Sequence, residues 1–262
     1  MKKFALKFIK NSGAIIFWVI VWFLIAKIVD LDLIVPSPDA VLTSLWRLIR
    51  TSDFWISTSF SLIRVTIGVG VSFIIGCTMA YFIWRSKILN ALLSPLLSII
   101  KATPVASFIV IAWLWFDTSA LPIFISSLIV IPIIAANISQ GIASVDNDLI
   151  EVAKAYKFNF SKKLFRLYIP SIAPYFLAAS KASLGMAWKA SVAAELIVLS
   201  KNSIGREIYD SKLMLETADV FAWTLVIIAL SIIVEKLFVL LLNHIGRTAR
   251  LLPQGGEIYA ED

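Results

Sequence analysis

The sequence predicts an all-α, polytopic membrane protein with six transmembrane helices, both termini on the inner side, and a cytoplasmic coupling helix between spans four and five. The 262 residues are 60% hydrophobic and only 16% charged, whereas soluble domains average roughly 45–50% apolar and about 25% charged residues. The apolar residues also form stretches near the length of about 20 that a spanning helix needs. This composition excludes a soluble enzyme, a disordered chain and a nucleic-acid-binding domain.

Six segments qualify as spans, or nearly so, within a single membrane domain that covers residues 1–262. They are 13–29, 61–84, 88–116, 121–140, 174–199 and 218–242. The first follows several lysines, as the apolar core of a signal peptide does, but no small-residue cleavage site comes after it. A turn rich in Asp and Pro follows instead, so we expect an uncleaved first helix.

The distribution of charge predicts the orientation. The net charge of +7 does not spread evenly, because the inner segments carry about twice as many Lys and Arg residues as the outer ones, the bias that fixes topology in membranes. The N-terminus and the C-terminus are therefore expected on the cytoplasmic side. In the first outer segment, 38–57, the apolar residues recur at helical spacing, which predicts a helix lying on the membrane surface.

The third span contains a lysine three residues before a proline. Lys101 precedes Thr103-Pro104, and a proline inside a helix bends or breaks it. Either the helix breaks and lines a cavity, or it kinks near the interface where Lys101 reaches water.

The inner segment 146–170 is predicted to form a helix–turn–helix elbow. Asp146 or Asp148 is suited to cap a first helix. That helix should stop near Phe158-Asn159, because asparagine tolerates the left-handed conformation. Ser161 is expected to cap a second short helix that Pro170 helps to end.

Aromatic residues at alternate positions suggest what the elbow does. Tyr156, Phe158 and Phe160 would form a docking knob for another protein. The alternative is a charged loop whose aromatic rings lie at the level of the lipid headgroups.

The elbow resembles a known family motif. Glu151-Val152-Ala153, followed by Lys157 and then Ile169-Pro170, is similar to the EAA loop of ABC importer permeases. Val152 and Lys157 depart from the family pattern, which has alanine and glycine there, and Asn159 is expected to take over the positive φ of the missing glycine. Val35-Pro36-Ser37-Pro38, Leu121-Pro122 and the segment 184–195 extend the resemblance to permeases of the nitrate, sulfonate and taurine group.

The resemblance implies a function for the whole chain. Two copies would form the solute pathway as a homodimer in a bacterial-type plasma membrane, and an external solute-binding protein would deliver the cargo. The elbow would couple to cytoplasmic ABC ATPase subunits through Glu151, Ala153, Lys154, Tyr156, Lys157, Phe158, Asn159 and Pro170. The chain has no P-loop motif, so we expect no bound cofactor and no enzymatic activity, with ATP used by the partner. The cargo would be a small anion such as a sulfonate, taurine or nitrate, or a heterocycle resembling a vitamin precursor.

Polar residues inside the spans are costly and often line cavities. The candidate pathway residues are Lys101, Ser183, Lys189, Ser191 and Glu195. Because Lys189 and Glu195 point about 120° apart on one helix, each is expected to have its partner elsewhere. Arg64, near the outer end of span two, is expected to snorkel to the interface.

Two other classes of function remain open. A self-contained secondary transporter could use Lys189 and Glu195 for ion coupling, but it has no need of an elbow that docks an ATPase. A membrane enzyme would need a nucleophile and a base, and no such arrangement stands out. A single histidine and a single cysteine, Cys77, predict neither a metal site nor an intrachain disulfide.

Overall fold

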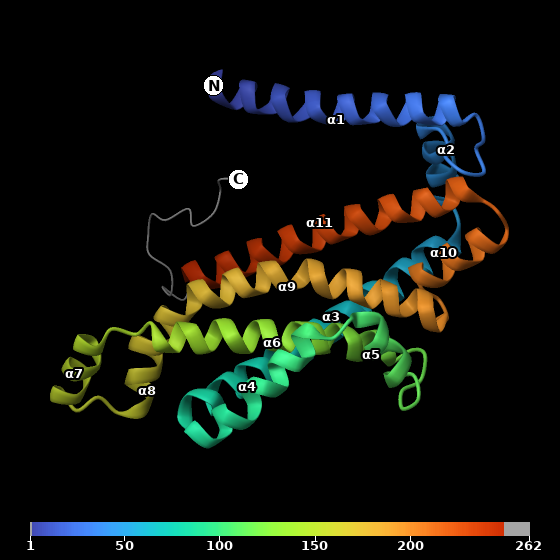
Figure 1. The fold of residues 1–262 in the computed structure, drawn as a ribbon. Coiled ribbons are helices and arrows are strands. Elements are labelled where there is room, and N and C mark those ends of the chain that lie inside the picture. Colours follow the sequence, from blue (N-terminus) through green and yellow to red (C-terminus); the bar gives the residue numbers. More distant parts are fainter. Residues whose placement is uncertain (1, 249–262) are drawn as a thin grey trace.

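A computed structural model describes residues 2–248, with side-chain surroundings for 13–241. The described chain is helical, without strands, in the order α1 (Lys2–Val29), α2 (Pro38–Ile49), α3 (Ser52–Arg85), α4 (Lys87–Ala102), α5 (Val105–Ala112), α6 (Leu121–Ala143), α7 (Asn147–Ala155), α8 (Phe160–Lys163), a π-helical turn (Leu164–Tyr168), α9 (Ile169–Val198), α10 (Ile204–Leu213) and α11 (Thr217–Thr248). The short helices α7 and α8 project from one end of the bundle, which we call the elbow end, and α2 and α10 lie at the other (Figure 1).

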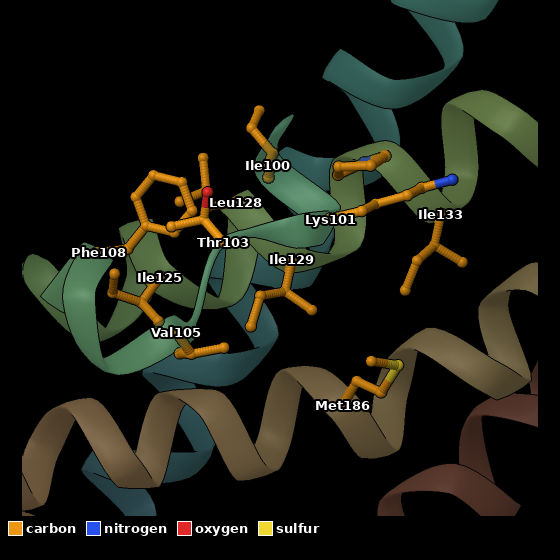
Figure 2. A pocket seen from close by; sticks show the side chains of 11 residues that line it. Ile100, Lys101, Thr103, Val105, Phe108, Ile125, Leu128, Ile129, Ile133 and Met186 are labelled. Atoms are coloured by element: carbon orange, nitrogen blue, oxygen red, sulfur yellow. The ribbon is translucent and has the colours of Figure 1, made fainter. Parts of the chain in front are cut away.

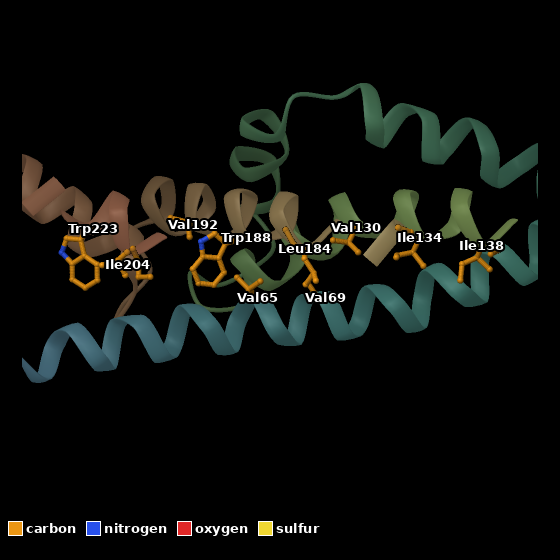
Figure 3. Packing of buried hydrophobic residues seen from close by; sticks show 14 of the residues in the cluster. Val65, Val69, Val130, Ile134, Ile138, Leu184, Trp188, Val192, Ile204 and Trp223 are labelled. Carbon is orange, nitrogen blue, oxygen red and sulfur yellow. The ribbon is translucent and has the colours of Figure 1, made fainter. Parts of the chain in front are cut away.

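Three long helices form the centre of the bundle. α6 packs extensively against both α3 and α9, while α1 stands apart from the bundle over most of its length (Figure 1). Val69 of α3, Ile134 of α6 and Trp188 of α9 belong to one buried cluster that continues to Trp223 of α11 (Figure 3). A smaller cluster joins α5, α6 and the last turns of α9.

Glycine allows the closest of these approaches. A Cβ at Gly68 would lie 2.9 Å from the carbonyl oxygen of Ile123, and one at Gly76 would lie 2.9 Å from Ile134. The hydroxyl of Ser127 donates to the carbonyl of Gly68 at 2.9 Å. The small residues of α3 therefore pack α3 against α6 within the chain, as small-residue stripes do between membrane helices.

The spans are only partly recognisable by length and hydropathy. Among the described residues, three helices are long and apolar enough to cross a membrane, at Ser52–Arg85, Leu121–Ala143 and Thr217–Leu241. The α4–α5 pair adds a fourth if it counts as one span, and Gly13–Val29 is a shorter apolar helix. α9 does not pass this test, because its charged and hydroxyl side chains lower its hydropathy.

Several expected boundaries are wrong. The expected third span, 88–116, is two helices bent by 103°, because Pro104 has no N–H to donate and forces Thr103 into an extended conformation (ψ 133°). The expected surface helix 38–57 ends at Ile49, and Thr51 caps the start of α3 by accepting from the N–H of Phe54 at 3.3 Å. The helix that contains the expected fifth span, α9, starts at Ile169 rather than 174, and α10 is a further helix in the segment that was expected to connect spans five and six.

Candidate functional site

The elbow begins with a capped helix. The carboxylate of Asp146 accepts a hydrogen bond from the N–H of Asp148 at 2.9 Å, so Asp146 rather than Asp148 is the cap. α7 then runs from Asn147 to Ala155, and the side chain of Ala153 is buried beneath it. Glu151 and Lys154 are exposed.

The turn that closes α7 is made at Lys157, two residues after the helix ends, and Lys157 takes the left-handed conformation with φ 49°. The N–H of Phe158 donates to the carbonyl of Ala153 at 2.9 Å, and the N–H of Lys157 donates to that of Lys154 at 3.0 Å. This pair of bonds is the Schellman motif, whose left-handed position glycine normally fills. The lysine at the family's glycine position thus keeps the glycine geometry, and the expectation that Asn159 would replace it is wrong.

Asn159 has a different role, because it starts the next helix. Its side-chain oxygen accepts from the N–H of Lys162 at 2.9 Å, so Asn159 caps α8 in place of the expected Ser161. Pro170 does not end a helix either. It lies in the first turn of α9, and the π-helical turn before it connects α8 to α9 without a break.

The elbow presents an apolar surface to solvent. Leu149, Val152 and Tyr156 recur at a spacing that places them on one face of a helix, and their side chains are 51%, 49% and 76% exposed. Phe160, at 68% exposure, and Phe165 extend this surface, which we call the elbow surface. Phe158 is half-buried, so it contributes less to the elbow surface than Tyr156 and Phe160 do. The 3–4 spacing of Leu149, Val152 and Tyr156 is the sequence signal from which this face could be identified.

Glu195 of α9 is fully buried and has hydrogen-bonding partners on other elements. Its carboxylate accepts from the hydroxyl of Ser61 at 2.8 and 2.9 Å, and from the Arg64 guanidinium at 3.1 Å. The backbone N–H of Gly205 lies 3.4 Å away. Glu195 therefore finds its partner on a neighbouring helix, as expected.

Arg64 does not snorkel to the interface. It is only 6% exposed, and besides Glu195 it donates to the carbonyl oxygens of Lys201 and Asn202 at 2.8 and 3.2 Å. The expectation is wrong because the buried carboxylate of Glu195, together with these two loop carbonyls, satisfies the guanidinium inside the protein. The arrangement, here called the Arg64 cluster, ties α3 to α9 and to the loop before α10.

The candidate pathway residues separate into two groups. Ser183, Ser191 and Glu195 are fully buried within the chain, so their side chains contribute to packing between helices. Lys101 and Lys189 are exposed. The uncovered side of α9 consists of residues that share one arc of the helix, namely Lys181, Ala182, Met186, Lys189, Leu196 and Ile197.

A cavity of about 270 Å³ lies where α4 breaks. Lys101 and Thr103 line it from the break, Ile129 and Ile133 from α6, and Met186 from α9 (Figure 2). This volume is just below the range of about 300–1,000 Å³ that is typical of small-molecule sites. The broken helix thus borders a cavity, which is the first of the two interpretations left open for the third span. Within the described residues no group of His, Cys, Asp and Glu side chains is arranged to hold a metal ion.

Comparison with known proteins relates the chain to transport permeases. Residues 72–250 match the family model described as "Binding-protein-dependent transport system inner membrane component". The bicarbonate transport system permease protein CmpB of Synechococcus elongatus is 26% identical over 70% of this chain and 66% of its own length. The chain thus spans just under two thirds of that relative.

Two further proteins are similar over almost the whole chain. The taurine transport system permease protein TauC of Escherichia coli is 24% identical over 95% of this chain and 90% of its own length. A crystal structure of a bacterial alginate ABC transporter, in complex with an alginate-bound periplasmic protein, contains a chain that superimposes with a TM-score of 0.58. It covers 93% of this chain and 96% of its own at 18% identity, so this likeness is one of fold.

Proposed function

Because the chain belongs to the family of binding-protein-dependent transport system inner membrane components, we propose that it is the permease subunit of an ATP-driven importer. It is a multi-pass protein of the plasma membrane. The observation that carries the proposal is the elbow surface, an exposed apolar patch on the segment that resembles the family's coupling loop. Such a patch on an otherwise charged projection is typical of a protein-binding site.

The proposed topology has six spans in one domain, with both termini in the cytoplasm. α1, α3, the α4–α5 pair, α6, α9 and α11 are the six spans, and the elbow end faces the cytoplasm. The basic residues of the elbow support this orientation. α9 is accepted as a span despite its charges, since Glu195 is neutralised within the protein by Arg64.

The elbow would dock into a cytoplasmic ABC ATPase subunit, which binds and hydrolyses the ATP, so that the chain itself holds no cofactor and catalyses no reaction. Glu151, at the start of the motif, and Tyr156, the most exposed aromatic residue of the elbow surface, would contact the ATPase together with Lys154 and Lys157. An external solute-binding protein would supply the cargo at the opposite end. A second, identical copy would complete the pathway along the uncovered side of α9, with Lys189 near the middle of that arc.

The proposed cargo is a small anion such as a sulfonate, taurine or nitrate, or a heterocyclic vitamin precursor. The name of one relative, a bicarbonate permease, supports the anion, as do the exposed Lys101 and Lys189. A secondary transporter would need Glu195 free for ion coupling, whereas its carboxylate is bonded to Arg64 and Ser61, so we do not propose that alternative.

The test is co-purification and uptake with elbow variants. Glu151→Ala and Tyr156→Ala should each reduce ATPase co-purification and ATP-dependent uptake in proteoliposomes, while leaving membrane insertion intact. Tyr81→Ala, a similar truncation of an exposed residue on α3, is the matched control and should change neither. Uptake by the chain alone without ATP, or unchanged coupling in both elbow variants, would contradict the proposal.

A further inference from the structure

Lys101 is a charged residue at mid-height in the bundle. It lines the cavity together with Pro132, which is midway between the ends of α6, and with Met186, close to the midpoint of α9. No carboxylate of the described chain pairs with it, since the ion pairs there involve Arg47, Arg64 and Arg206. An uncompensated lysine inside a membrane is costly, so such residues usually face water or a ligand.

Lys101 is the charged residue among those that line the cavity. Apart from Lys101 and Thr103, the side chains that line it are aliphatic, aromatic, proline or thioether groups. In apolar surroundings the field of one ammonium group is weakly screened and acts over a longer distance than in water. Lys189 adds a second positive charge one turn beyond Met186 on the uncovered side of α9.

The break between α4 and α5 determines where Lys101 lies. Pro104 directs α5 away from α4 at 103°, so Lys101 occupies the last turn of α4 next to an irregular backbone segment. Interrupted helices inside membranes are tolerated where they border a protein-lined or water-filled cavity. In the described chain a cavity, a helix break and a lysine without a carboxylate partner therefore lie together.

We propose that Lys101 makes this cavity a selectivity site that admits small anions and repels cations. The proposal rests on the proposed permease function and specifies its substrate class. A monovalent sulfonate, carboxylate or nitrate would be attracted by the ammonium group, while the apolar walls, Ile129 and Met186 among them, would contact the remainder of the molecule. An uncharged heterocycle would lack this charge–charge attraction to Lys101.

The experiment measures charge selectivity at the cavity wall without knowledge of the cargo. In a Cys77→Ala background, Met186→Cys places a single thiol at the cavity, and the full chain is reconstituted in lipid vesicles. Reaction rates are measured with the anionic reagent sulfonatoethyl methanethiosulfonate and the cationic reagent trimethylammonioethyl methanethiosulfonate. Because one fixed charge accelerates the anion and slows the cation, Lys101→Met should lower the anion-to-cation rate ratio about tenfold.

Two further variants make the result interpretable. Lys101→Arg should keep the ratio of the parent, because it preserves the charge. Met214→Cys, at an exposed methionine in the turn between α10 and α11, is the matched control, and its ratio should not respond to Lys101→Met.

An anion-to-cation rate ratio in the parent no higher than that of the Met214→Cys control, a ratio that Lys101→Met leaves unchanged, or no reaction at Met186→Cys would overturn the proposal. None of these results depends on ATPase binding. Failure of the selectivity site is thereby distinguishable from failure of the permease function, which the elbow variants test.

Discussion

Replacing Arg64 with methionine should strongly destabilise the bundle, because it leaves Glu195 buried without its counter-charge. The guanidinium donates to Glu195 at 3.1 Å and to two loop carbonyls at 2.8 and 3.2 Å, and the two side chains are only 7% and 0% exposed. Removal of one partner from a buried ion pair typically costs about 3–5 kcal/mol. We expect a loss in this range.

The matched control is the exposed pair of Arg206 and Asp210, which lie 2.8 Å apart on one helix with side chains 41% and 37% exposed. Arg206→Met should cost no more than about 0.5 kcal/mol. The assay is thermal unfolding in detergent, followed by a maleimide dye that reacts with Cys77, the single cysteine, as the core opens.

A double-mutant cycle separates the pair from its surroundings. Glu195→Gln removes the buried charge, so the double variant with Arg64→Met should be markedly more stable than the sum of the two single losses predicts. Additive losses, or an Arg64→Met variant no less stable than Arg206→Met, would refute the reasoning that the buried charge is what makes Arg64 necessary.

Three other substitutions test separate features. Lys157→Gly should relieve the positive φ of 49° and stabilise the elbow by about 1 kcal/mol, so amide hydrogen exchange at Phe158 should slow several-fold; faster exchange would contradict this. Gly205→Ala should lower the free energy of unfolding by about 2 kcal/mol, because its Cβ would lie 2.5 Å from the backbone nitrogen of Leu196. A melting temperature equal to that of the parent would contradict this, since it would show that the start of α10 shifts to make room. Burial raises the pKa of Glu207 above its ordinary value of 4.5, against the opposing hydrogen bond from Ser57. Between the ordinary and the raised pKa the folded state binds more protons, so stability should fall as pH rises through that window. Melts from acidic to neutral pH should show this fall in the parent and not in Glu207→Gln.

Much of the elbow was predictable from local sequence, because its helices are set by neighbouring residues. Asp146 has a short acceptor side chain before an apolar run, and such a residue caps a helix almost regardless of its environment. The position of the left-handed residue was not predictable from propensity. Asparagine tolerates that conformation better than lysine, yet Lys157 adopts it, because the bonds from Lys157 and Phe158 back to α7 fix the turn.

The membrane class, the Pro104 break and the coupling-loop resemblance follow from the order of residues, since composition, proline chemistry and motif spacing are properties of the chain alone. Only the tertiary structure decided which polar side chains are buried within the protein and which are exposed. It brings Arg64 against Glu195 across 131 positions and leaves Lys101 beside a cavity, with no carboxylate of the described residues paired to it. The reason is physical: the cost of a charge in a membrane depends on what lies within a few ångströms of it, and that is set by which helix faces meet.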